Sequence, residues 1–121
     1  GKMRYQVRLF LNGRSKEFTA MEDSGNRLVE PVTGKPVSII AAADVKEFGS
    51  EPAGVLMIPY RAVGTKSGML PGILFDRMEI TDGENRSVRI DRPVVAVSKE
   101  PLFFRKDFTM ILPESLFTDK L

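Results

Sequence analysis

Residues 20–28 read AMEDSGNRL, and within them Asp23, Ser24 and Gly25 could together carry out hydrolytic chemistry. A carboxylate can activate water, a neighbouring hydroxyl can hydrogen-bond to an adjoining loop, and a glycine lets backbone N–H groups approach the carboxylate. The same three residue types are also common in ordinary turns, where short polar side chains bond to their own backbone. The triplet alone therefore leaves two interpretations open, an acid–base site or a plain turn.

The composition restricts the chemistry that remains possible. The chain has no cysteine and no histidine, which excludes disulfides, thiolate nucleophiles, Ser-His-Asp triads and the commonest zinc ligands. Acid–base chemistry near neutral pH must then come from Asp, Glu, Lys or Tyr. We expect no metal and no cofactor. The net charge of +2, with scattered Lys and Arg, does not indicate nucleic acid as a partner.

Aspartic proteases use an Asp-Ser/Thr-Gly triplet in this way, but they need two aspartates. The other aspartates of this chain are not followed by Ser/Thr-Gly; they are Asp44, Asp76, Asp82, Asp91, Asp107 and Asp119. A chain of 121 residues is also too short for a two-lobed enzyme with two triplets. The site can be completed only by two-fold symmetry, so we expect a homodimer in which each copy contributes Asp23.

The elements predicted around the triplet place Asp23 at the end of a strand. Residues 5–11 follow a strand pattern, with Tyr5, Val7, Leu9 and Leu11 on one face and Gln6, Arg8 and Phe10 on the other. Asn12-Gly13 predicts a tight hairpin turn, and residues 17–21 form the returning strand that leads to Asp23. After a turn at Thr33-Gly34, the apolar residues of 37–40 predict a further short strand.

The rest of the chain predicts a mostly-β domain. Residues 41–48 favour a helix of about two turns. Further strands are expected over 55–62, over 69–80 with a break at Pro71-Gly72, and over 87–90, 94–98 and 108–112. A short C-terminal helix is expected over 113–117, with Pro113 in its first turn. Many short strands with Gly and Pro turns predict a closed β-barrel or sandwich, formed by one domain spanning 1–121.

The second hairpin has a flexible, polar tip that could act as a flap over a substrate. The flap candidates are Val63, Gly64, Thr65, Lys66, Ser67 and Gly68. Gly64 and Gly68 would allow hinge motion. A plain exposed hairpin is the alternative.

Two longer segments resemble one protease family. Residues 23–37 follow the pattern D-S-G-N-x-L-x-x-P-x-T-G-x-P-V, which resembles the signature of the sporulation sigma-E factor processing peptidases of spore-forming Firmicutes. IPYRAVG at 58–64 and GMLPG at 68–72 resemble later segments of that family, in the same order. Asn26 is informative, because retroviral proteases usually carry Ala or Ser there. The resemblance covers most of the chain.

The resemblance implies a fold similar to retroviral proteases and an active-site loop formed by Asp23, Ser24, Gly25 and Asn26. It implies an aspartic endopeptidase that works as a dimer and removes the pro-sequence of the pro-sigma-E transcription factor. Family members have an N-terminal multi-span membrane domain at the cell membrane of the sporulation septum, with the protease domain facing the cytoplasm. No apolar run here approaches the roughly 20 residues of a membrane span. We therefore expect this chain to be the soluble protease domain alone, linked to the membrane only through a domain that it lacks.

Two residues depart from the protease pattern. Glu22 stands before Asp23, where aspartic proteases usually have an apolar residue; we expect its side chain on the opposite face of the strand, facing solvent or a basic partner such as Arg27 or Arg61. Pro113 stands where retroviral proteases have glycine before their C-terminal helix, and the alternative there is a helix that simply packs on the core. These departures keep two other interpretations open: a non-catalytic protease-like domain that binds a peptide or partner, and a small β-barrel adaptor in which Asp-Ser-Gly is only a turn.

Overall fold

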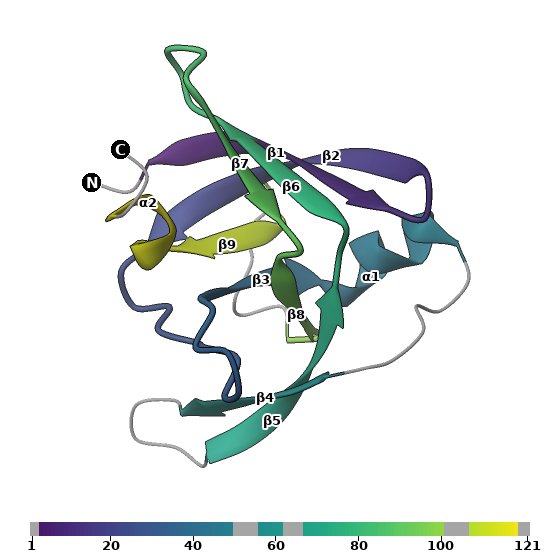
Figure 1. Cartoon of the computed structure of the whole chain (residues 1–121), viewed down its shortest axis with the longest axis vertical. Helices are drawn as coiled ribbons and strands as arrows, with labels where there is room; N and C mark the ends of the chain where they lie inside the picture. The colour runs from purple at the N-terminus through teal and green to yellow at the C-terminus, as the bar shows by residue number, and fades with distance from the viewer. Residues whose placement is uncertain (1–2, 50–55, 62–66, 101–106, 119–121) are drawn as a thin grey trace.

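The computed structural model describes residues 3–49, 56–61, 67–100 and 107–118. In this part of the chain nine strands form one mixed sheet with the order β4-β5-β8-β3-β9-β2-β1-β6-β7 (Figure 1). The strands are β1 (Arg4–Leu11), β2 (Arg14–Asp23), β3 (Val37–Ala41), β4 (Leu56–Arg61), β5 (Ser67–Leu74), β6 (Arg77–Thr81), β7 (Ser87–Asp91), β8 (Val94–Ser98) and β9 (Met110–Pro113). The short helices are α1 (Ala42–Val45), the 3-10 turn η1 (Lys46–Phe48) and α2 (Ser115–Thr118).

The first hairpin ends at the Asp-Ser-Gly triplet, as predicted. β1 and β2 pair in antiparallel fashion from Arg4↔Met21 to Leu11↔Arg14. Asn12 (φ 52°) and Gly13 (φ 79°) both adopt the left-handed conformation that a two-residue hairpin turn requires. β2 then runs on to Asp23, so the carboxylate lies where the strand gives way to a loop.

The C-terminal strand lies in the middle of the sheet. β9 is parallel to β2 and antiparallel to β3, so it separates the strand that carries Asp23 from the next strand along the chain. Asp23 pairs with Pro113, which is fully buried. The prediction that Pro113 begins the final helix was wrong, because it is the last residue of β9 and α2 begins at Ser115. The fixed φ of proline suits both the end of a strand and the start of a helix, and only the pairing with β2 decides between them.

Two clusters of buried side chains support this arrangement. The larger one lies under β1, whose inward residues Tyr5, Val7, Leu9 and Leu11 alternate as the pattern predicted. The smaller cluster includes Ile39, Ile58, Val94, Ala96 and Ile111, and it joins the β4–β5 hairpin to the centre of the sheet. The hairpin therefore rests on apolar packing that is continuous with the strands around Asp23.

The second hairpin is confirmed, with β4 and β5 antiparallel from Leu56↔Gly72 to Arg61↔Ser67. The predicted break at Pro71-Gly72 was wrong, since β5 continues through both residues. Pairing of β5 with β8 begins only at Gly72, so Pro71 lies where the missing N–H costs no pairing with β8. The flap candidates Val63, Gly64, Thr65 and Lys66 lie outside the described residues.

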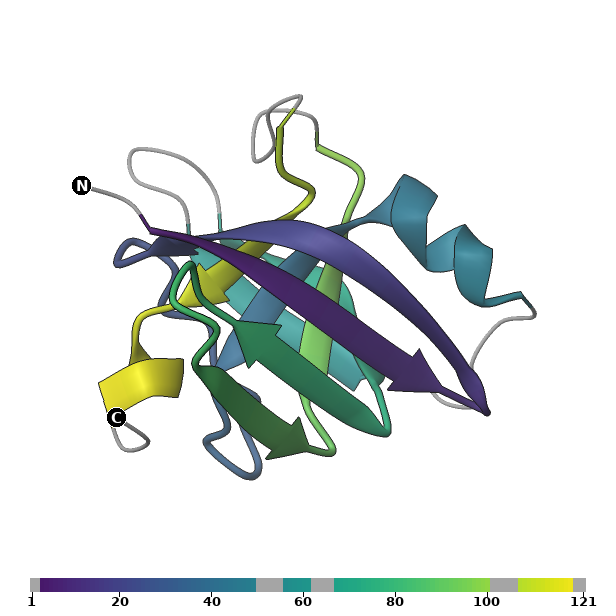
Figure 2. The same ribbon diagram turned by 90° about the horizontal axis from the view of Figure 1, so that it is seen from above.

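The mostly-β class and the short C-terminal helix are confirmed, and α1 with η1 takes the place of the predicted helix over 41–48. The sheet is strongly curved, and the β1–β2 pair crosses over the strands behind it when seen from above (Figure 2). The described pairings leave β4 and β7 as the two edge strands, so closure into a barrel stays a prediction. Across the described ranges, no helix is long and apolar enough to cross a membrane.

Candidate active site

Two backbone N–H groups of the residues that follow Asp23 donate hydrogen bonds to it. The Gly25 N–H donates a hydrogen bond to Asp23 Oδ1 at 3.0 Å, and the Asn26 N–H donates to the Asp23 carbonyl at 3.0 Å. A Cβ atom on Gly25 would lie 3.3 Å from Oδ1, closer than side chains normally pack. Glycine at this position therefore lets the N–H approach the carboxylate and fix its orientation. Asp23 is half-buried, whereas Ser24 and Gly25 are exposed.

Asn26 joins the loop to the next strand. Its side chain is buried, with Nδ2 donating to the Val37 carbonyl at 3.0 Å and Oδ1 accepting from the Leu28 N–H at 3.2 Å. The Val37 N–H in turn donates to the Leu28 carbonyl at 3.0 Å. The position uses a donor atom and a separate acceptor atom of one amide to reach two backbone groups. Ala has neither atom, and the single oxygen of Ser cannot lie at both places.

A buried carboxylate, Glu30, organises the loop that follows, and the sequence analysis did not single it out. Glu30 is 6% exposed, and it accepts hydrogen bonds from the Val32 N–H (3.0 Å), the Thr33 N–H (2.7 Å) and the Thr33 hydroxyl (2.6 Å). These bonds, led by the Thr33 hydroxyl, hold the pKa of Glu30 below its usual value. The spacing Glu-x-x-Thr-Gly over residues 30–34 was the sequence signal that could have predicted this loop. In the structure Gly34 adopts a left-handed φ of 72°.

An open cavity of about 1050 Å³ lies over Asp23. Its floor comes from the Asp23 loop with Leu28, Ile39 and Ile111, and its roof comes from residues 59–61 and 67–70 of the β4–β5 hairpin. Ser67 and Gly68 line the same cavity as Asp23, and their role in a flap stays a prediction. Among the described lining residues Asp23 is the only carboxylic acid, while Arg27 and Arg61 are the cations. The described lining residues of one chain thus provide one carboxylate in a largely apolar groove.

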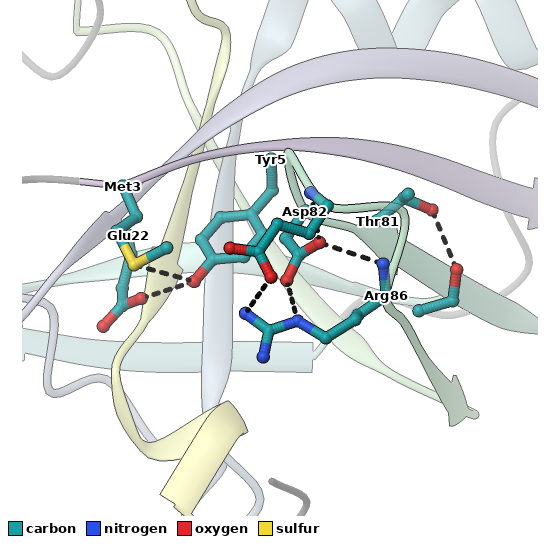
Figure 3. Close-up of polar contacts among 8 residues, drawn as sticks. Met3, Tyr5, Glu22, Thr81, Asp82 and Arg86 are labelled. Atoms are coloured by element: carbon teal, nitrogen blue, oxygen red, sulfur yellow. Dashed lines mark hydrogen bonds and ion pairs between the residues drawn. The ribbon is translucent and has the colours of Figure 1, made fainter.

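Glu22 faces away from this cavity. Its Oε1 accepts a hydrogen bond from the Tyr5 hydroxyl at 2.8 Å, from the neighbouring strand (Figure 3). Neither arginine that we expected as its partner makes this contact; both line the cavity instead. Burial, followed by the hydrogen bond to Glu22 and its negative charge, raises the pKa of Tyr5 to about 12. Tyr5 is therefore a protonated donor throughout the physiological range, and the Glu22 carboxylate is satisfied beside Asp23.

Tyr5 also holds the C-terminal helix. Its ring stacks on Phe117 of α2, with centroids 4.8 Å apart and planes inclined by 15°. Leu116 and Phe117 are both buried, so the interpretation of a helix that packs on the core is confirmed. One side chain thus connects β1, the strand that carries Asp23, and α2. Within the described ranges no cluster of three or more Asp or Glu side chains could hold a metal ion.

The whole sequence is similar to one family of known proteins. A family model described as "Sporulation factor SpoIIGA" matches residues 1–116. The sporulation sigma-E factor-processing peptidase of Priestia megaterium is 25% identical over 91% of this chain and 43% of its own length. A putative sporulation sigma factor-processing peptidase of Bacillus thuringiensis subsp. kurstaki is 23% identical over 96% of this chain and 86% of its own length. A probable sporulation sigma-E factor-processing peptidase of Clostridium acetobutylicum is 25% identical over 89% of this chain and 40% of its own length.

The chain thus spans about two-fifths of the Priestia and Clostridium relatives. No solved structure matches it significantly.

Proposed function

The chain belongs to the Sporulation factor SpoIIGA family of peptidases, and on this basis we propose that it is the catalytic domain, over 1–121, of a homodimeric aspartic endopeptidase. One observation carries the proposal. The Asp23 carboxylate is held by the Gly25 N–H at the end of a strand, on the floor of a largely apolar cavity under a β-hairpin. A groove of this kind suits an extended peptide whose scissile bond lies over the carboxylate.

The second catalytic group is Asp23 of another copy. Peptide hydrolysis by carboxylates needs one acid and one base, and the cavity of a single chain offers one carboxylate among its described lining residues. A two-fold axis beside Asp23 supplies the other without any further motif in the sequence. We also propose that the sheet closes as in retroviral proteases, and that residues 63–68 close over the bound peptide.

Two carboxylates at such an axis share one proton, because both cannot ionise cheaply. The ionised Asp23 takes a proton from a water molecule as the water oxygen bonds to the scissile carbonyl carbon. The protonated Asp23 gives its proton to the carbonyl oxygen, which yields a neutral tetrahedral diol. As the diol collapses, the C–N bond breaks, the ionised Asp23 accepts one hydroxyl proton, and the protonated Asp23 donates its proton to the leaving nitrogen. The Gly25 N–H keeps Oδ1 oriented, and the Ser24 hydroxyl hydrogen-bonds to the opposing loop across the axis.

The names of the relatives indicate the substrate. The Priestia megaterium relative is a sporulation sigma-E factor-processing peptidase, and we propose that this chain removes the pro-sequence of a pro-sigma-E factor. In the full-length protein a membrane domain would hold it at the sporulation septum, with the protease domain facing the cytoplasm. The proposed reaction uses no cofactor and no nucleic acid.

The Asp23→Asn substitution tests the assignment, because it keeps the size of the side chain and removes the acid. We expect cleavage of pro-sigma-E by the purified chain to fall by about 100-fold or more. Asp91→Asn is the matched control, since Asp91 is exposed on β7 and its carboxylate accepts a hydrogen bond from Arg89. If Asp23→Asn cleaves as fast as the unchanged chain, Asp23 is not the catalytic residue.

A non-catalytic peptide-binding domain is the second candidate, and it is favoured by the presence of one carboxylate among the described lining residues of the cavity. This alternative predicts a monomer even at high concentration. It also predicts that Asp23→Asn binds a pro-sigma-E peptide as tightly as the unchanged chain, while neither protein cleaves it.

A further inference from the structure

Gly68 and Tyr60 lie directly opposite one another on the β4–β5 hairpin. A Cβ atom at position 68 would lie 2.8 Å from both Cε1 and the hydroxyl oxygen of Tyr60, and 2.9 Å from Cζ. Real Cβ atoms do not approach so closely, so the Tyr60 ring lies across the space that the missing side chain leaves. The backbone of Gly68 is not in the left-handed region, which means that conformation alone does not require glycine here.

Both residues belong to the wall that faces Asp23. Tyr60 is the one aromatic side chain among the described lining residues of the cavity. Its hydroxyl makes no hydrogen bond within the described part of the chain. Around it the cavity is mostly apolar, with Leu28, Met69 and Leu70 nearby in the same lining. A phenol in this setting combines a flat apolar surface with a donor that needs a partner, and a peptide carbonyl provides one.

We propose that Tyr60 is a substrate-binding residue and that Gly68 is the positioning residue that seats its ring, so that the pair shapes the subsite opposite Asp23. This inference rests on the proposed function, since the occupant is a peptide substrate. It gives Gly68 a role other than that of a hinge. The absent side chain makes room for the ring, and the ring defines the wall against which a substrate side chain packs.

Steady-state kinetics of four variants on pro-sigma-E tests the pair. Tyr60→Phe keeps the ring and loses the donor, and we expect KM to rise about three- to tenfold with kcat nearly unchanged. Gly68→Ala displaces the ring, and we expect KM to rise about tenfold or more. In a Tyr60→Leu background the same Gly68→Ala change should have little further effect, because the smaller side chain leaves room for the new methyl group.

Gly72→Ala in the same strand is the matched control. A Cβ atom there would lie 2.8 Å from Ile58 Cγ1, so it crowds the hairpin without touching Tyr60. Its effect should be the same in the unchanged chain and in the Tyr60→Leu background, whereas the effect of Gly68→Ala should not. Equal effects of Gly68→Ala in both backgrounds would overturn the inference, because they would mean that the glycine serves the backbone and not the ring.

A binding measurement separates this inference from the proposed catalysis. The chain has two tyrosines and no tryptophan, so in a Tyr5→Phe/Asp23→Asn double variant Tyr60 is the only tyrosine. Titration with a synthetic peptide that spans the pro-sigma-E cleavage site should shift the ring signals of Tyr60 in an NMR spectrum. No shift at saturating peptide would overturn the inference even if Asp23 proves catalytic. A shift would sustain it even if Asp23→Asn retains cleavage and the proposed mechanism fails.

Discussion

At the scale of single residues, the neighbourhood of Asp23 is stabilised by polar contacts that differ on its two sides. On the cavity side the Gly25 N–H fixes the carboxylate, and the buried Asn26 side chain holds the loop against β3. On the other side Glu22 bonds to the Tyr5 hydroxyl, so its charge is satisfied away from the cavity. A carboxylate that departs from the usual protease pattern is thus accommodated by one tyrosine on the neighbouring strand.

The Tyr5 hydroxyl gives a pH dependence whose sign follows from its environment. Burial and Glu22 raise the pKa of Tyr5 to about 12, above the usual value of 10.0. The folded state therefore holds this proton more tightly than the unfolded state does. The resulting stabilisation is fully present below pH 10 and is lost as the pH rises from about 10 to about 12.

Urea denaturation at a series of alkaline pH values measures this loss of stability. We expect the free energy of unfolding to fall between about pH 10 and pH 12. Tyr5→Phe keeps the ring that stacks on Phe117 and should lose most of this decline, while being less stable at neutral pH. An unchanged alkaline decline in Tyr5→Phe would contradict the raised pKa of Tyr5.

At the scale of elements, the local signals in the sequence were sufficient for most strands. Alternation over β1, the Asn12-Gly13 turn and the end of β2 at Asp23 all follow from nearby residues. The insertion of β9 between β2 and β3 does not, because it pairs residues about ninety positions apart and no local pattern encodes that choice. The same reason explains the misassigned Pro113, which pairs with Asp23.

Two phenylalanines on opposite faces of the sheet provide a matched test of the packing of α2. Phe117 is 7% exposed and stacks on Tyr5, so Phe117→Ala should destabilise the chain by about 3–5 kcal/mol. Phe10 is only half-buried and lies under the Arg77 guanidinium at 3.8 Å, so Phe10→Ala should cost about 1 kcal/mol. Thermal or urea unfolding measures both, and equal losses would contradict the anchoring of α2 by Tyr5.

At the scale of the whole molecule, the outer face of the first strands and the surface around Asp23 differ in character. The outer face of β1, β2, β6 and β7 carries charges in mutual contact, including Arg8–Glu17 at 2.9 Å, Arg77–Glu79 at 3.2 Å and Arg89–Asp91 at 2.9 Å. The Asp23 face is instead largely apolar and open, with one carboxylic acid among its described lining residues. The sequence predicted this solitary carboxylate, but no sequence signal shows how two copies meet.

The most direct test of the central claim, that Asp23 of two copies forms one active site, is a subunit-mixing experiment. The unchanged chain and Asp23→Asn are mixed at fixed total concentration, allowed to exchange subunits, and assayed for cleavage of pro-sigma-E. If each site needs two intact Asp23 residues, activity follows the square of the unchanged fraction, so that an equal mixture retains about one quarter. A linear dependence, with about one half retained, would contradict the shared site.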